Sequence, residues 1–530
     1  MPIIADMTLR ARRKQRAAAI ARIPQEVKDF YGVTEDLLKT LFHNFVGHAV
    51  FPGDPDFEKD RYGHNLYPDL AKPLVIAYCR TEADVGYCLA VARKVASKNI
   101  PFTCRGGGHS NAGYSVVTGI VIDVSPMSTP YLAPDGSSVF IGAGATLGDL
   151  NSALAPYHLH VPGGECGSVG VAGHSMGGGY GFTSRMFGLN CDFVIGARVM
   201  LANGSVVRAD ATTNPDLFWA IRGGTGNNFG VLLSLQYRTA RLDDVWAFVL
   251  TWPISAAAKV MPVLQDKYMR RGLTSDMGYQ LAWGPYEGNK DDERLYMMGM
   301  YRGDPKAGEA LLDEVRKIGG GQIVKQTTGP YIKLNGYLLD WYQDPPLEST
   351  KEIKQTNFVD RTLSEAEWQK IVDYYLTKPN MYDMVAFEVY GGVATDPGVS
   401  NAFIHRENDF DMFIDSFSNP EKFGTTPAQA AAWLKGFDEL MQAYSNGHKY
   451  QNYPNRDNVN YRWNYWGNAY PTLLAIKKKY DPGNFFNFQQ AITDYPDGDG
   501  ITRSDAKPEF PETPIEYDLP AGAYSGLDGG

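Results

Sequence analysis

Two glycine-dense stretches contain the residues best suited to do chemistry. The first, residues 105–113, reads RGGGHSNAG and contains His109; the second, residues 162–179, reads PGGECGSVGVAGHSMGGG and contains Cys166. Such a density of glycine lets a backbone approach a ligand closely and turn its N–H groups toward a phosphate, so a dinucleotide is the expected guest. Neither stretch is the G-x-G-x-x-G turn of a Rossmann domain, and neither has the lysine of a P-loop, which disfavours ordinary NAD and ATP sites. The structural alternative for both stretches is a set of tight turns.

Short β-type runs and helical patterns alternate around these stretches and must position them. Thr81 followed by Asp84 is typical of a helix start, and apolar side chains then recur on one helical face as far as Asn99. Strands are predicted at 101–104, 120–124, 139–142, 194–201 and 231–238, and helices at 147–158 and 216–222. Between about 242 and 442 the chain changes to longer amphipathic segments with strand-like runs between them, at 307–318, 365–376 and 295–301. This second region indicates a sheet covered by helices on one side.

Composition excludes several classes of partner. The chain has 530 residues, enough for two packed domains, and its net charge of −10 offers no general attraction for nucleic acid or anionic lipid. Its five cysteines are widely spaced and form no C-x-x-C pair, which argues against a disulfide framework or a zinc site. No apolar stretch is long enough for a membrane span or a signal peptide, so we expect a cytoplasmic protein. We interpret the basic run Arg10–Arg16 as a solvated, frayed terminal helix rather than a nucleic-acid arm or transit element.

Taken together and in this order, the motifs closely resemble the FAD-linked oxidases of the vanillyl alcohol oxidase superfamily, and within it the berberine bridge enzyme-like group. The resemblance covers about 67–240 and a C-terminal element that includes NYWGN at 464–468 and KYDPGNFF at 479–486. It implies an FAD held by two covalent bonds, from His109 to the flavin 8α-methyl group and from Cys166 to ring position 6. A cysteine thiolate and a neutral imidazole are nucleophilic enough near neutral pH for such attachment.

The same resemblance implies further contacts to the cofactor. We expect His174 to pack or hydrogen-bond near the pyrophosphate loop in a structural role. The other expected contacts lie in the two glycine stretches and at the start of a later strand: Arg105, Gly106, Gly107, Gly108, Ser110, Gly167, Val169, Gly170, Gly173, Gly230 and Val231. At Val169 the family has a gate beside the reactive flavin carbon, where a small side chain leaves room for oxygen.

The catalytic base is expected from the second region. The segment YQNYP at 450–454 resembles the family motif whose tyrosine is the base in several members, which points to Tyr453. Glu388 falls where relatives carry a tyrosine or, in some oligosaccharide oxidases, an acid beside the base. A tyrosine with a pKa near ~10 needs such a helper to accept a proton at neutral pH. The glutamate base of berberine bridge enzyme maps by gap-free count onto Met412, so only a register shift would bring Asp411 or Asp415 into that role.

We therefore predict an α+β fold with a split FAD-binding domain and a second α+β substrate domain. The expected parts are an N-terminal helical segment at 1–66, the FAD-binding domain at 67–240, the substrate domain at 241–462, a completing element at 463–495 and a surface tail at 496–530. The predicted reaction passes hydride from a hydroxyl-bearing sugar, oligosaccharide or secondary metabolite to FAD, with oxygen reduced to hydrogen peroxide. A dehydrogenase with another electron acceptor and a flavin-binding protein without turnover are the alternatives. Neither a metal, a nucleic acid nor a membrane is expected as a partner.

Overall fold

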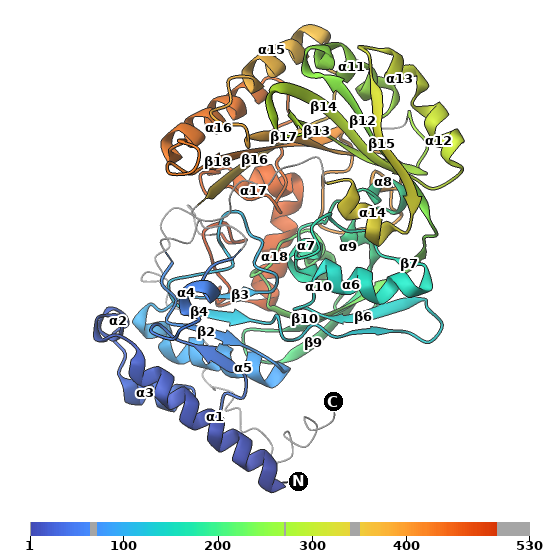
Figure 1. Cartoon of the computed structure of the whole chain (residues 1–530). Helices are drawn as coiled ribbons and strands as arrows, with labels where there is room; N and C mark the ends of the chain where they lie inside the picture. Colours follow the sequence, from blue (N-terminus) through green and yellow to red (C-terminus); the bar gives the residue numbers. More distant parts are fainter. Residues whose placement is uncertain (1, 64–70, 270–271, 340–349, 495–530) are drawn as a thin grey trace.

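The α+β organisation is confirmed by the computed structural model, which describes residues 2–63, 71–269, 272–339 and 350–494. These residues form a four-stranded, a five-stranded, a two-stranded and a seven-stranded sheet, each associated with helices (Figure 1). No helix among them is long and apolar enough to cross a membrane.

The four-stranded sheet presents the first glycine stretch at its edge. Its order is β1 (His48–Val50), β2 (Val75–Tyr78), β4 (Ile120–Asp123) and β3 (Phe102–Arg105), with β2, β4 and β3 parallel and β1 antiparallel to β2. Helix α5 (Glu82–Val95) begins with the predicted reciprocal cap between Thr81 and Asp84, and η2 (Ala96–Lys98) follows it. The glycine stretch leaves the sheet directly after β3, an edge strand.

The N-terminal segment is only partly helical, which corrects the expectation for 1–66. Helices α1 (Pro2–Arg22), α2 (Gln25–Tyr31), α3 (Glu35–Leu41) and α4 (Phe57–Asp60) are present, but β1 joins the sheet between them.

The basic run within α1 is also not a solvated face. Arg16 is buried and donates to the carbonyls of Phe42 and Phe45, while Arg12 donates to the carbonyl of Val46. Carbonyls at and after a helix C-terminus lack intrahelical partners, so these guanidinium groups hold α1 against the end of α3.

The five-stranded sheet is antiparallel throughout. Its order is β5 (Pro130–Leu132), β6 (Ser138–Gly142), β10 (Val231–Arg238), β8 (Val194–Met200) and β9 (Val206–Asp210). A two-stranded sheet pairs β11 (Ala240–Arg241) with β7 (Leu159–His160). The helical elements associated with this region are α6 (Leu147–Leu154), η3 (Ala155–Tyr157), α7 (Val171–Met176), α8 (Ser184–Phe187), α9 (Asn190–Phe193) and α10 (Pro215–Ala220). The second glycine stretch thus lies between β7 and α9 and includes α7.

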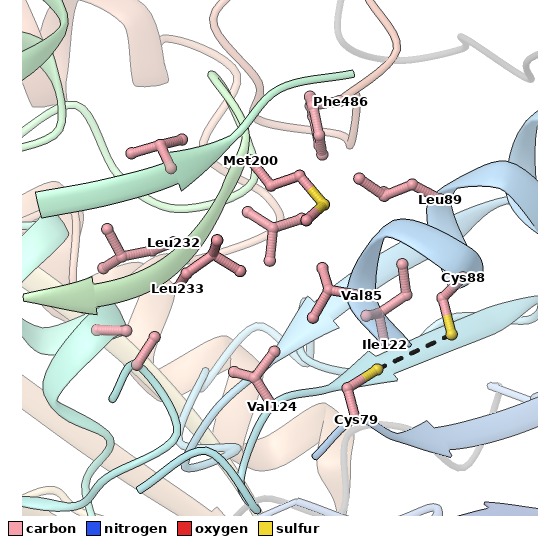
Figure 2. Packing of buried hydrophobic residues seen from close by; sticks show 14 of the residues in the cluster. Cys79, Val85, Cys88, Leu89, Ile122, Val124, Met200, Leu232, Leu233 and Phe486 are labelled. Carbon is pink, nitrogen blue, oxygen red and sulfur yellow. Dashed lines mark hydrogen bonds between the residues drawn. The ribbon is translucent and has the colours of Figure 1, made fainter. Parts of the chain in front are cut away.

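One apolar core joins these two sheets to the C-terminal element. Val85 and Leu89 of α5 share this core with Met200, Leu232 and Leu233 of the five-stranded sheet (Figure 2). Phe486 enters the same core, as do residues of α17 (Tyr461–Trp466) and α18 (Tyr470–Tyr480), with η6 (Gly467–Ala469) between these helices. The last part of the described chain therefore completes the first folding unit, as expected for a split domain.

The seven-stranded sheet forms the second unit. Its order is β15 (Gln322–Gly329), β12 (Val245–Pro253), β14 (Asn289–Tyr301), β13 (Met277–Tyr286), β17 (Met384–Val389), β18 (Phe410–Ser418) and β16 (Lys351–Val359). One face packs against helices α11 (Ala257–Lys267), α13 (Asp313–Lys317), α15 (Glu365–Tyr375) and α16 (Pro427–Met441). Figure 1 shows these helices on the far side of the sheet from α7. Helices α12 (Pro305–Leu311) and α14 (Tyr331–Tyr337) and the short η4 (Ile254–Ala256) and η5 (Gly392–Ala394) complete the unit.

The exact domain boundaries stay predictions. The expected start near residue 67 and the expected tail at 496–530 lie outside the described residues. Within the described part, the predicted strands and helices lie close to their expected positions, and strand β10 has the predicted bounds.

Candidate functional site

The two glycine stretches cross in direct backbone contact. A Cβ atom on Gly107 would lie 2.3 Å from the nitrogen of Gly170, and one on Gly170 would lie 2.5 Å from the nitrogen of Gly107. Any side chain at either position would push the two segments apart. Glycine is required here because two backbones approach, and the approach brings the His109 and Cys166 segments together.

A cavity of about 560 Å³ lies between the crossed segments and the seven-stranded sheet. Its volume is in the range typical of small-molecule sites. The expected site residues that line it are Arg105, Gly106, Gly107, Gly108, His109, Ser110, Cys166, Val169, Gly170, Gly173, His174, Gly230, Val231 and Tyr453. The structure thus brings nearly all of the expected cofactor contacts to one cavity.

The two nucleophilic residues reach this cavity from opposite stretches. Cys166 is exposed and His109 is partly exposed, and the ring nitrogen Nε2 of His109 shares a 2.9 Å hydrogen bond with Ser168 Oγ. This hydrogen bond joins the His109 stretch to the residues just after Cys166. Both side chains are therefore accessible to one ligand.

His174 is part of the cavity wall and bonds to the segment that leads to Cys166. Burial lowers the pKa of His174 to about 4, so the ring is neutral and its Nε2 accepts a 3.1 Å hydrogen bond from the N–H of Gly164. One turn of α7 thereby holds the backbone that leads to Cys166. Gly173, on the same helix, faces open space, since a Cβ there would meet no atom within 4 Å.

Two of the expected contact residues, Arg105 and Gly167, have hydrogen-bond or ion-pair partners within the protein. The Arg105 side chain forms a buried ion pair with Asp123, its neighbour across β3 and β4, and donates to the carbonyl of Asp60 at 2.8 Å. Arg105 therefore holds the sheet together rather than offering a free charge to a ligand. Gly167 does not line the cavity, because its carbonyl accepts a 2.8 Å hydrogen bond from Gly148 at the start of α6.

The remaining expected contacts form part of the cavity wall. Val169 packs against the first core, and its backbone bonds to Cys166 and Leu147. Gly230 precedes β10, and a Cβ there would lie 2.6 Å from the carbonyl oxygen of Met200 on β8. The close packing of β10 against β8 is therefore sufficient to explain a glycine at position 230, whether or not a ligand binds there.

The face of the seven-stranded sheet opposite its helices covers the cavity. Strand alternation sends Phe387 and Met412 into the helix-covered core, and it turns Ala386, Phe413 and other neighbours toward the cavity. The cavity-facing side chains of this sheet are Gln280, Ala282, Met298, Glu352, Lys354, Met384, Ala386, Phe413, Asp415 and Phe417.

Tyr453 and Glu388 are in direct contact. Tyr453 Oη donates a 2.6 Å hydrogen bond to Glu388 Oε1, and the second oxygen of Glu388 has no hydrogen-bond partner among the described residues. Tyr453 lines the cavity, whereas Glu388 is buried behind it. Burial, followed by the charge of Asp411, raises the pKa of Glu388, and burial raises the pKa of Tyr453 well above its usual range.

Sequence reasoning missed a charged cluster beside this pair. Lys354 Nζ lies 4.4 Å from the centre of the Tyr453 ring, 3.1 Å from Asp415 Oδ2 and 3.4 Å from Glu352 Oε1. Although burial alone lowers it, the two carboxylates raise the pKa of Lys354 above its usual range. The alternation of charged residues in the run KEIKQ at 351–355 was the available signal.

It also missed Glu165, which directly precedes Cys166. Gln280 Nε2 donates to Glu165 Oε1, and burial raises the pKa of Glu165 to about 7. A carboxyl group inside the cysteine motif was visible in the sequence, but its partner lies 115 residues away.

Two family models match the chain at the parts that build this site. The FAD binding domain matches residues 73–210, and the model described as berberine and berberine like matches residues 449–493, which contain Tyr453. These matches and the oxidoreductase relatives support a berberine bridge enzyme-like FAD-linked oxidoreductase.

Relatives of this chain match it over most of its length. An FAD-linked oxidoreductase of Bacillus subtilis (strain 168), YgaK, is 28% identical over 461 residues, which cover 84% of this chain and 97% of the relative. A chitooligosaccharide oxidase of Gibberella zeae is 28% identical over 469 residues, with 83% and 91% covered. The structure of Physcomitrella patens BBE-like 1 superposes with a TM-score of 0.76 at 26% identity, over 85% of this chain and 97% of that one.

The register of the seven-stranded sheet shows which residue of β18 lies beside Glu388. Strands β17 and β18 pair without a shift, which places Phe387 opposite Met412 and Glu388 opposite Asp411. Met412 points into the helix-covered core, so the gap-free count selects the wrong face of the strand. Asp411 reaches the Tyr453 side of the sheet without any register shift.

Proposed function

We propose that this protein is an oxidase that takes two electrons from a hydroxyl-bearing sugar, oligosaccharide or secondary metabolite. In this proposal FAD is bonded covalently to His109 and Cys166, and oxygen is reduced to hydrogen peroxide. The observation that carries the proposal is the 2.6 Å hydrogen bond from Tyr453 to Glu388 at the wall of the cavity that both glycine stretches line.

The residues around the cavity fit an FAD. Gly173 faces open space, the crossed glycine segments line the cavity, and the side chains of both His109 and Cys166 are accessible. When bound, FAD supplies the acceptor for a hydride from the carbon that bears the substrate hydroxyl group.

Tyr453 is the proposed general base. Its Oη takes the proton of the substrate hydroxyl group while its own proton passes to Glu388 Oε1, so the phenol need not ionise alone. Lys354 adds a positive charge near the Tyr453 ring and favours negative charge on the phenol oxygen. Burial of Glu388 keeps water from competing for the transferred proton.

The nature of the substrate is supported by the relatives and by the cavity wall. A relative is named as a chitooligosaccharide oxidase, and the cavity offers both aromatic side chains and hydrogen-bonding groups to a ring with hydroxyl substituents. Phe413 and Phe417 are the aromatic side chains of the sheet, and Gln280 and Lys354 are donors.

The test is anaerobic reduction of the purified yellow protein by a panel of sugars, oligosaccharides and aromatic alcohols. At least one hydroxyl-bearing compound should bleach the flavin spectrum, and admission of air should restore it with formation of hydrogen peroxide. Dithionite serves as the control that each preparation contains reducible flavin. Bleaching by dithionite alone would contradict the enzymatic proposal, and bleaching without reoxidation by air would favour a dehydrogenase.

The covalent bonds are tested separately on denatured protein. Acid-precipitated wild-type protein should retain its flavin, and Cys166→Ala should retain it through His109 with a changed absorption spectrum. Release of free FAD from denatured wild-type protein would contradict covalent attachment.

A further inference from the structure

The three residues before Cys166 are held by side chains of the second unit. Tyr331 Oη donates to the carbonyl of Gly163 at 3.3 Å, and Asn335 Nδ2 donates to the carbonyl of Glu165 at 2.9 Å. Both donors belong to α14, and both side chains are buried. Helix α14 thus contacts the backbone of the cysteine segment from across the boundary between the two units.

A third contact reaches the side chain next to the cysteine. Gln280 of β13 donates through Nε2 to Glu165 Oε1, and Gln280 is itself buried and lies opposite Glu388 in the sheet. The strand that carries the partner of Glu165 is therefore the neighbour of the strand that carries Glu388. One sheet face contacts both the proposed base pair and the cysteine segment.

The first unit holds the same segment from its other side. His174 accepts the N–H of Gly164, Val169 donates its N–H to the carbonyl of Cys166 at 3.2 Å, and Gly148 donates to Gly167. Cys166, Gly167 and Ser168 are nevertheless exposed residues. The segment is thus anchored through its backbone and through Glu165, while the thiol remains accessible.

We propose that Gln280 and Asn335 position Cys166 for its bond to the flavin, so that this bond forms efficiently only when the second unit is docked. The inference rests on the proposed covalent FAD. Formation of the bond breaks the S–H bond of Cys166 and one ring C–H bond and forms the S–C bond. The two hydrogens and two electrons pass to dioxygen, giving hydrogen peroxide, so atoms and electrons balance.

Glu165 supports this assignment through its charge. Its pKa is raised by burial to about 7, so near neutral pH part of the population carries the negative charge that strengthens the hydrogen bond from Gln280. Gln280 holds that carboxylate, and Asn335 holds the carbonyl of the same residue. Loss of both contacts frees the residue adjacent to Cys166, and a misplacement of about 1 Å can slow a reaction roughly 10²-fold.

The extent of the bond between Cys166 and the flavin can be measured by counting thiols, without any measurement of activity. The chain has five cysteines, so denatured, reduced protein should show four reactive thiols when Cys166 is linked and five when it is not. The combined variant Gln280→Leu with Asn335→Leu should show nearly five thiols, and mass spectrometry should find flavin on the His109 peptide alone. Glu165→Gln, which keeps an acceptor for Gln280, should retain more of the bond than Glu165→Leu.

Gln265→Leu is the matched control. Gln265 is buried in α11 of the second unit and bonds to Asp409 at 3.0 Å, but it makes no contact with the cysteine segment. The Gln265→Leu variant should be less stable than wild-type protein and should still show four thiols. Four thiols in the combined variant would overturn the positioning role. Five thiols in wild-type protein would instead overturn the covalent bond to Cys166, and with it this inference.

Discussion

Glu388 on β17 lies directly opposite Asp411 on β18, and the two residues share the face of the sheet that Tyr453 contacts. Both are buried, and like charges on directly opposed residues destabilise each other's ionised forms. In the proposed mechanism, the pair therefore controls how readily Glu388 accepts a proton from Tyr453.

Replacement of the proposed base should slow the chemical step and leave the cofactor in place. Tyr453→Phe removes the hydroxyl group that contacts Glu388, so the rate of flavin reduction by substrate should fall about 10²-fold or more. Stopped-flow absorbance under anaerobic conditions measures this rate. An unchanged rate in a variant that retains its full flavin content would remove Tyr453 from the mechanism.

Removal of the helper carboxyl should move the pH optimum upward. In wild-type protein the rate should rise with pH as Glu388 loses its proton, because only the ionised carboxylate can accept the proton of Tyr453. In Glu388→Gln that acceptor is absent, and Tyr453, whose pKa is raised by burial, must lose its proton without help. The rate of flavin reduction as a function of pH tests this, and an optimum that does not move excludes the helper role.

Neutralisation of Asp411 should have the opposite effect. Burial is the largest cause of the raised pKa of Glu388, and the charge of Asp411 is the next. Asp411→Asn should therefore lower that pKa and shift the acidic limb of the rate profile to lower pH. Asp360→Asn, an exposed position just beyond β16, is the control and should leave the limb unchanged. A shift to higher pH would show that Asp411 acts other than through its charge.

Local patterns predicted much of the fold and the flavin side of the site. The cap from Thr81 to Asp84, strand β10 and the two glycine stretches are all short-range features, and each could be recognised from residues close in sequence. Glycine at 107 and 170 is explained by the crossing itself, which places His109 and Cys166 at one cavity.

Pairings between distant residues could not be predicted in this way. Whether Asp411 or Met412 faces the site depends on the register of β17 with β18, and a change of one residue reverses the face. Gln280 and Glu165 are far apart in the chain and meet only because the two units pack together. The ion pair of Arg105 with Asp123 likewise depends on the parallel pairing of β3 with β4, which local patterns do not reveal.

That buried ion pair gives a prediction about stability. Arg105 and Asp123 have side chains that are 6% and 3% exposed, so Asp123→Ala would leave a buried guanidinium group without its counterion and should cost about 3–5 kcal/mol. Glu82→Ala, which breaks the exposed pair of Glu82 with Arg198, is the control and should cost at most about 1 kcal/mol. Urea unfolding midpoints measure both, and equal effects would contradict the buried role.

The last prediction concerns oxygen. Val169 lines the cavity three residues after Cys166, and it packs on one side against the first core. Oxygen needs little more than a methyl-sized space beside the flavin, and one added methylene group in close-packed surroundings is enough to fill it. Val169→Leu should therefore slow reoxidation of the reduced protein in aerated buffer and leave its anaerobic reduction by substrate nearly unchanged. Val169→Ala is the matched control, because it enlarges the space and should not slow reoxidation. Rapid reoxidation in the leucine variant would contradict the gating role, and slow reoxidation in wild-type protein would favour a dehydrogenase that uses another electron acceptor.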